Sequence, residues 1–100
     1  MDLPHFEGFD WDEGNLGKCA AHGLSKAEVE SIFAAGPLVG PDPFDPMIER
    51  RWRAIGKTGS GRAAFVVFTV RDSDRAHLIR PISARYMHAT EARKYAQEQS

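Results

Sequence analysis

The sequence contains a single cysteine, Cys19, which excludes an internal disulfide. A chain without disulfides fits a reducing compartment, and we expect a cytoplasmic protein. Cys19 falls within a predicted helix, where a small packing residue is more common than a nucleophile. The four histidines lie far apart, without a close cysteine or histidine neighbour, which argues against a structural zinc site. The sequence therefore predicts no metal and no other cofactor.

Long apolar runs are also missing. The longest, residues 63–70, is interrupted by Thr69 and falls far short of the roughly 20 residues that a membrane-spanning helix needs. The acidic N-terminal residues contain no apolar core segment, so we do not expect a secretory signal. Repeats and low-complexity stretches are absent. We expect one soluble domain, residues 1–100, in which residues 1–8 form an extended N-terminal arm.

Charge is plentiful but unevenly distributed. Residues 1–49 carry ten acidic and two basic side chains, a net charge of −8. Residues 50–100 carry nine arginines and two lysines against four acids, a net charge of +7. Guanidinium groups gathered on one face would bind a polyanion, most commonly a nucleic acid, because their planar fork fits phosphate oxygens. Alternatively, the two halves neutralise each other across the fold, and charge alone does not separate these interpretations.

Local signals predict two helices in the acidic half. Residues 1–12 are expected to be extended and anchored by apolar side chains, namely Phe6, Phe9 and Trp11. Asp12 can cap a helix over about residues 13–21, which ends at His22-Gly23. Ser25 and Glu28 form a capping box for a second helix, which Gly36-Pro37 stops.

The basic half changes to the period of two that is typical of strands. Residues 37–46 predict a strand fragment and a loop, and three strands follow over 51–57, 62–71 and 76–85. Short turn sequences between these strands predict an antiparallel meander, and Pro81 places the last strand at an edge or in light pairing. A helix over 90–98, capped by Thr90, ends the chain. This order predicts an α+β fold, with helices packed on one face of an antiparallel sheet.

Several side chains of the basic half have the chemistry of a phosphodiester site. We expect them to converge on one side or end of the sheet: Arg51, Arg53, Arg80, Arg85 and His88. Arginine can hold a phosphate and stabilise the charge of its transition state, whereas histidine exchanges a proton near neutral pH. Tyr86 adds a ring on which a base could stack. The alternative is that strand arginines are solvated or pair with acids.

Two further groups are candidates. Asn15, Lys18 and His22 share one helix face and could extend a phosphate-binding surface. Alternatively, Asn15 and His22 cap the helix and Lys18 is solvated, which the pattern alone favours. Glu49 precedes the arginine run and either orients Arg51 or serves as a base.

Three segments, in this order, resemble the BrnT family of toxins. The opening is similar in Phe9-Asp10-Trp11-Asp12-Glu13-Gly14-Asn15, Lys18 and His22-Gly23-Leu24-Ser25. A central match is Glu49-x-Arg51-x-x-Ala54-Ile55-Gly56. The most specific match is Arg80-Pro81-Ile82-Ser83-Ala84-Arg85-Tyr86-Met87-His88, with Glu91 and Tyr95 behind it. The resemblance runs from about Phe9 to Tyr95, nearly the whole chain.

This resemblance implies the toxin of a bacterial type II toxin–antitoxin system with a RelE-like fold. It implies a metal-independent endoribonuclease that cleaves mRNA and inhibits translation. The implied partner is a ribbon-helix-helix antitoxin, and the toxin would contact operator DNA only as part of the complex with it. The resemblance is also compatible with a homodimer of the toxin. The polar residues that match the family by position are Lys18, His22, Glu49, Arg51, Arg80, Arg85 and Glu91.

The implied mechanism uses three arginines and one proton acceptor. Arg51, Arg80 and Arg85 would clamp the scissile phosphate, while Glu49, His22 or His88 accepts the proton of the ribose 2′-hydroxyl.

Two departures from the family pattern put catalysis in question. Asp45-Pro46 stands where relatives often carry a His-Ser pair, and Ala21 replaces a commonly basic residue. The competing hypothesis is therefore a catalytically weak interaction protein, which binds an antitoxin or nucleic acid without cleaving it.

Overall fold

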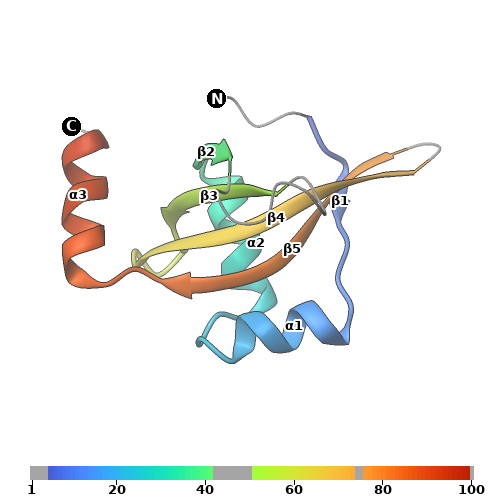
Figure 1. The fold of residues 1–100 in the computed structure, drawn as a ribbon, viewed down its shortest axis with the longest axis horizontal. Helices are drawn as coiled ribbons and strands as arrows, with labels where there is room; N and C mark the ends of the chain where they lie inside the picture. Colours follow the sequence, from blue (N-terminus) through green and yellow to red (C-terminus); the bar gives the residue numbers. More distant parts are fainter. Residues whose placement is uncertain (1–4, 42–50, 74–75, 100) are drawn as a thin grey trace.

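The computed structural model describes residues 5–41, 51–73 and 76–99 as five strands and three helices (Figure 1). In chain order these are β1 (Gly8–Phe9), α1 (Glu13–Ala20), α2 (Lys26–Ala34), β2 (Leu38–Pro41), β3 (Trp52–Lys57), β4 (Ala63–Ser73), β5 (Ala76–Tyr86) and α3 (Ala89–Gln99). The predicted α+β class and the predicted elements are confirmed. Glu49, Asp45-Pro46 and the rest of the predicted loop after Pro41 lie outside the described residues.

The strands form one sheet in the order β1-β5-β4-β3-β2. β2 to β5 pair antiparallel, which confirms the predicted meander. The sheet is mixed, however, because β1 pairs parallel with β5 through Gly8 opposite Leu78 and Phe9 opposite Ile79. Part of the predicted arm is therefore a strand, since Phe9 packs into the core and draws its backbone alongside β5. β1 pairs with β5 at Leu78 and Ile79 and does not extend to Pro81. Among the described strands, Pro81 is therefore paired on its β4 side alone, opposite Phe68, which agrees with the light pairing predicted there.

Reciprocal capping boxes begin both N-terminal helices. The Asp12 side chain accepts a hydrogen bond from the Asn15 backbone, and the Asn15 side chain accepts one from the Asp12 backbone. Ser25 and Glu28 form the same arrangement at α2, as predicted. Gly23 follows α1 with a φ of +86°, a left-handed conformation that glycine adopts without strain and that commonly ends a helix.

The core lies between α1, α2 and one face of the sheet. Alternate strand residues point into it and are buried, among them Ala54, Val66, Phe68, Ile79 and Ala84. Phe33 of α2 makes edge-to-face contacts with Phe9 and Phe68, at centroid distances of 5.6 and 5.1 Å. Cys19 of α1 is buried in the same cluster, as expected for a packing residue, and burial raises the pKa of its thiol.

α3 departs from the prediction, because it lies at one end of the sheet rather than on the face that α1 and α2 cover (Figure 1). Its sequence is mostly polar, and Tyr95 is its largest apolar residue. The helix begins at Ala89, so the predicted cap Thr90 lies inside it, and the Glu91 carboxylate accepts the His88 backbone N–H instead. At 11 residues α3 is the longest helix described, and no helix in the described segments could cross a bilayer.

Candidate functional site: a cationic cleft on the open face of the sheet

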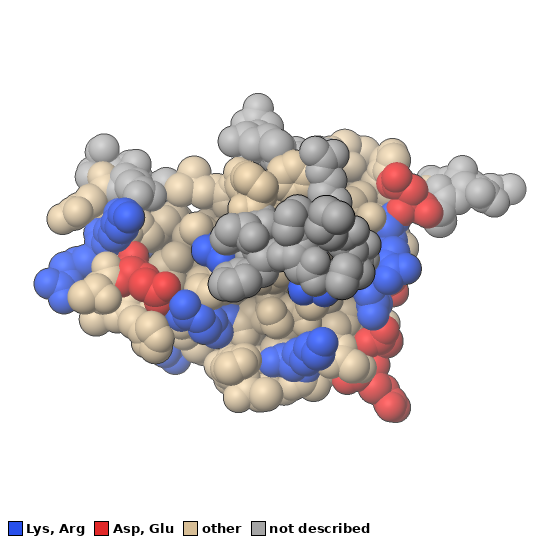
Figure 2. Space-filling view, in the orientation of Figure 1, with Lys and Arg blue, Asp and Glu red and all other residues tan. Residues whose placement is uncertain are grey.

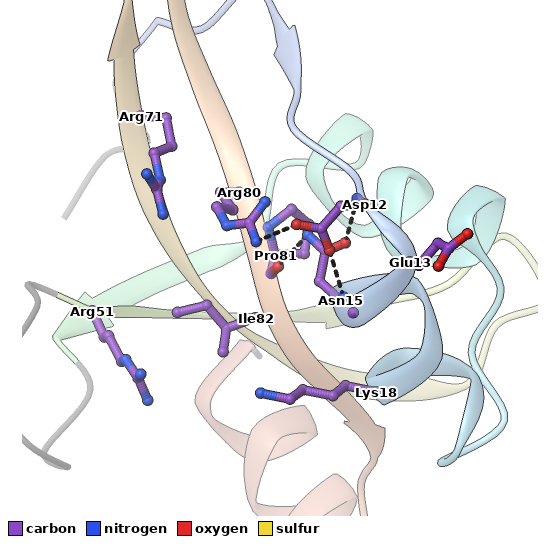
Figure 3. A pocket seen from close by; sticks show the side chains of 10 residues that line it. Asp12, Glu13, Asn15, Lys18, Arg51, Arg71, Arg80, Pro81 and Ile82 are labelled. Carbon is purple, nitrogen blue, oxygen red and sulfur yellow. Dashed lines mark hydrogen bonds and ion pairs between the residues drawn. The ribbon is translucent and has the colours of Figure 1, made fainter.

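A cleft of about 600 Å³ opens beside α1 on the sheet face opposite α2 (Figure 3). Residues from α1, β4, β5 and the segment before β3 line it: Asp12, Glu13, Gly14, Asn15, Lys18, Arg51, Arg71, Arg80, Pro81 and Ile82. Lys and Arg side chains are distributed over this face of the molecule (Figure 2). The cleft therefore unites chain segments far apart in sequence on a basic surface.

Two of the cleft's cations have no carboxylate partner among the described residues. Lys18 is exposed on α1, and its side chain extends across the cleft below Ile82 (Figure 3). Arg51 reaches the cleft from the segment before β3, and its enclosed Nε donates no hydrogen bond to any described residue. The Arg51 side chain as a whole is only partly buried and lines the cleft, so its positive charge would attract an anion there. The positive charges of Lys18 and Arg51 are therefore available to bind an anion in the cleft.

Arg80, by contrast, is held by carboxylates at the start of α1. Its guanidinium lies 2.6 Å from Asp12 and 3.3 Å from Asp10, and its side chain is 21% exposed. The Asn15 backbone N–H, followed by the Arg80 guanidinium, lowers the pKa of the Asp12 carboxyl, and Asp12 in turn raises the pKa of Arg80. Arg80 therefore has a fixed position and orientation in the cleft, with part of its charge already compensated.

Asn15 is a structural residue of this site. It is buried, and its side-chain amide donates hydrogen bonds to the Asp10 and Pro81 carbonyl oxygens at 3.0 and 2.7 Å. Together with the capping box, these bonds fix α1 against β5. This confirms the capping interpretation for Asn15, whereas Lys18, three residues later, reaches the cleft.

A second cluster surrounds Phe65 further along the same sheet face. The Arg53 and Arg85 guanidinium groups lie over the Phe65 ring, 5.0 and 4.2 Å from its centroid. Arg85 also binds Glu91 through two parallel hydrogen bonds of 2.9 and 3.0 Å. Arg85, chiefly, and the His88 backbone N–H lower the pKa of the Glu91 carboxyl from 4.5 to about 2. The predicted arginines thus occupy two groups rather than one.

The Arg85–Glu91 pair predicts a measurable change on mutation. Arg85→Ala should raise the pKa of Glu91 from about 2 most of the way to 4.5, the value of an unpaired carboxyl. Since the folded-state pKa lies below the unfolded one, the pair stabilises the fold above pH 4.5, and this contribution is lost as the pH falls towards 2. A carboxyl-carbon NMR titration measures the pKa directly. Arg93→Ala, which changes an exposed cation of the same helix, should leave it near 2; an unchanged pKa in Arg85→Ala would contradict the assignment.

The remaining predicted residues do not join the cleft. His22 is exposed in the turn after α1 and His88 is exposed before α3, and neither lines it. Tyr86 lies on the helix-covered face, where its hydroxyl donates to Glu28 and the Arg62 guanidinium covers its ring at 3.6 Å. This geometry does not fit base stacking beside Arg85.

Sequence reasoning missed three features of the cleft. Arg71 lies an even number of positions after Phe65 along β4, so the two side chains share a face. This period of two could have placed Arg71 on the open face. No local signal predicted that Ile82 would lie between the cations of the cleft (Figure 3). The ion pair of Arg80 with Asp12 also had no local signal, because these two residues are 68 positions apart.

The fold and the cleft define a small α+β domain with a cationic cleft, a kind of surface that attracts polyanions. The family model of BrnT, the ribonuclease toxin of a type II toxin–antitoxin system, matches residues 11–91. The chain belongs to this family of ribonuclease toxins, which confirms the resemblance, and its class of system pairs a toxin with an antitoxin. The search of curated proteins found no match for the chain.

Proposed function

We propose that this protein is a metal-independent endoribonuclease that cleaves mRNA and thereby inhibits translation. The observation that carries the proposal is the pair formed by Lys18 and Arg51, two cations that border one open cleft without a described carboxylate partner. Arg80 adds a third cation whose orientation is fixed by Asp12. Lysine and arginine at one site supply the positive charge that a metal ion provides in other nucleases.

In this mechanism the scissile phosphate occupies the cleft between Lys18, Arg51 and Arg80. The ribose 2′-hydroxyl gives its proton to an acceptor, and the 2′-oxygen attacks the phosphorus. A new bond forms between the 2′-oxygen and the phosphorus. The bond from phosphorus to the 5′-oxygen breaks, and that oxygen takes up a proton from water. A 2′,3′-cyclic phosphate and a 5′-hydroxyl end result. The cations stabilise the additional negative charge of the five-coordinate phosphorus.

The identity of the proton acceptor follows partly from the lining of the cleft. His22 and His88 lie outside it, which weakens both as candidates. Asp12 and Glu13 line it, but Asp12 is a weak base because the Asn15 N–H and Arg80 lower the pKa of its carboxyl. The Glu13 carboxylate points away from Arg51, Lys18 and Arg80 (Figure 3). Glu49, only two positions before Arg51 in the sequence, is the acceptor we favour.

We propose a different role for Arg85 from the phosphate clamp that the sequence suggested. Arg80 pairs with Thr69 and Arg85 with Phe65 across β4, so the two positions are about 13 Å apart at 3.3 Å per strand residue. Arg85 and Arg53 are therefore assigned to RNA flanking the scissile phosphate rather than to the phosphate itself.

The antitoxin of the system is proposed to be a ribbon-helix-helix protein, and the toxin would contact operator DNA only within that complex. The proposal rests on the family resemblance. Because the proposed substrate is mRNA, we propose that the protein acts in the cytoplasm.

Cleavage in the presence of EDTA tests the proposed reaction. Purified protein should cut a single-stranded mRNA in EDTA and leave 2′,3′-cyclic phosphate ends, because no step uses a metal. A 2′-O-methyl group at the cleavage position should abolish that cut, since the attacking hydroxyl is then absent. Mass spectrometry of the fragments identifies the ends. Cleavage that appears only after magnesium is added would contradict metal independence, and intact RNA under both conditions would contradict the nuclease.

A second candidate function is an interaction protein without useful nuclease activity. The observation that supports it is that carboxylates already pair with two of the predicted phosphate-binding arginines, Asp12 with Arg80 and Glu91 with Arg85. Expression in a bacterium without the antitoxin separates the two. Growth arrest that Arg51→Ala relieves supports the nuclease, whereas unimpeded growth supports the interaction protein.

A further inference from the structure

A smaller recess of about 290 Å³ lies on the same sheet face as the cleft, next to α3. Its apolar walls come from Ile55 of β3, Phe65 of β4, Met87 and Tyr95 of α3. Ile55 and Phe65 are paired across the strands, and Arg85 is the next residue in the same row. The recess is at the lower end of the size range of ligand pockets, so it fits a small, flat group.

The edge of this recess is positively charged. Lys94 lines it and forms no ion pair with a carboxylate in the described part of the chain, and Arg53 lines it from β3. The carboxylate of Glu91 is also present, but the two hydrogen bonds from Arg85 compensate its charge. An apolar recess with cations at its edge is complementary to a nucleotide, in which a flat base adjoins an anionic phosphate.

We propose that this recess binds one base of the single-stranded RNA whose scissile phosphate occupies the cationic cleft. The inference rests on the proposed function and adds a second contact to it. The base stacks against the aromatic rings at the recess, those of Tyr95 and Phe65, and its phosphate contacts Lys94. The base belongs to a nucleotide that flanks the cut, because the rows of Arg80 and Arg85 are about 13 Å apart along the sheet.

This arrangement gives α3 a function that its packing does not explain. The helix lies at the end of the sheet, and the Arg85–Glu91 pair attaches it there while Tyr95 and Lys94 border the recess. The helix thus completes a binding site that β3 and β4 form only in part. The base in the recess then contributes to the choice of cleavage position.

Binding of RNA with a single abasic position tests the inference. In a short, 2′-O-methylated RNA that the enzyme cannot cut, removing the base at each position in turn should weaken wild-type binding about tenfold at one of them. Tyr95→Ala should weaken binding of the intact RNA by the same factor and should no longer respond to that abasic position. Lys94→Ala should weaken binding about threefold, and Arg93→Ala, its exposed neighbour outside the recess, should match the wild type. Fluorescence anisotropy measures each affinity.

Lys94 is exposed, so its substitution reports on the recess even if Tyr95→Ala fails to fold. The inference is overturned if both variants bind the intact RNA like the wild type. It is also overturned if the methyl signal of Met87 shifts on addition of the antitoxin but not of RNA, because the recess would then be a protein-binding site. In either case Arg51→Ala still tests the cleft independently, so failure of the recess and failure of the proposed nuclease are distinguishable.

Discussion

Arg51→Ala is expected to lower the rate of RNA cleavage by a factor of about 10²–10³, the usual cost of losing one preorganised donor at a developing oxyanion. The reason is that the Arg51 guanidinium borders the cleft and its enclosed Nε has no hydrogen-bond partner among the described residues. Single-turnover cleavage of a labelled RNA measures the effect. Arg51→Lys should recover only part of the rate, since an ammonium group cannot form the two parallel hydrogen bonds of a guanidinium.

Arg93→Ala is the matched control, because it removes an arginine that is exposed and lies outside both the cleft and the recess. Its cleavage rate should be that of the wild type. Thermal melting of Arg51→Ala should also match the wild type. A normal cleavage rate in Arg51→Ala would remove the principal support for the cleft as the reaction site.

Asn15→Ala is expected to lower the free energy of unfolding by about 3 kcal/mol, because it removes one half of a capping box and leaves the Asp10 and Pro81 carbonyl oxygens without their side-chain donor. The Asn15 side chain bonds the Asp12 N–H and the carbonyl oxygens of Asp10 and Pro81. Alanine can replace none of these bonds, so α1 loses one of the two hydrogen bonds of its capping box and the side-chain bonds that attach it to β5, while Asp12 still caps the backbone. Denaturant unfolding followed by circular dichroism measures the loss.

Lys18→Ala, on the same helix, should leave stability unchanged while it reduces cleavage, because Lys18 is exposed and lines the cleft. The two variants thus separate support of the fold from function within a single turn of helix. Equal stability of Asn15→Ala and the wild type would show that the bond to Pro81 is not an important attachment.

The sequence predicted the local structure of this protein well, because the signals involved are short-range. Capping at Asp12 and Ser25 and the alternation along β3 and β4 depend on residues two to four positions apart. The pairing of β1 with β5 depends on residues about 70 positions apart, such as Gly8 and Leu78, and no local pattern reports it. The same is true of the Arg80–Asp12 ion pair, which determines what Arg80 can do in the cleft.

The placement of Tyr86 shows how one irregularity changes a prediction. Strict alternation from Arg80 would place Tyr86 on the same face and Arg85 on the other. The register between β4 and β5 shifts by one residue, since Val67 lies opposite Ser83 but Phe68 lies opposite Pro81. This bulge returns Arg85 to the open face with Arg80 and turns Tyr86 towards the helices. Nothing in the sequence marks the position of the shift except Pro81, which is compatible with a bulge.

NMR mapping of bound RNA tests the central claim most directly, since it shows which side chains contact the phosphate. A short 2′-O-methylated RNA would be added to ¹⁵N-labelled protein, with the Arg Nε–Hε signals and the Lys18 side-chain methylene signals observed. The account predicts that the signals of Arg51 and Lys18 shift most, with smaller changes for Arg80 because Asp12 already holds it. Shifts confined to α2 and the helix-covered face, with Arg51 and Lys18 unchanged, would contradict the account.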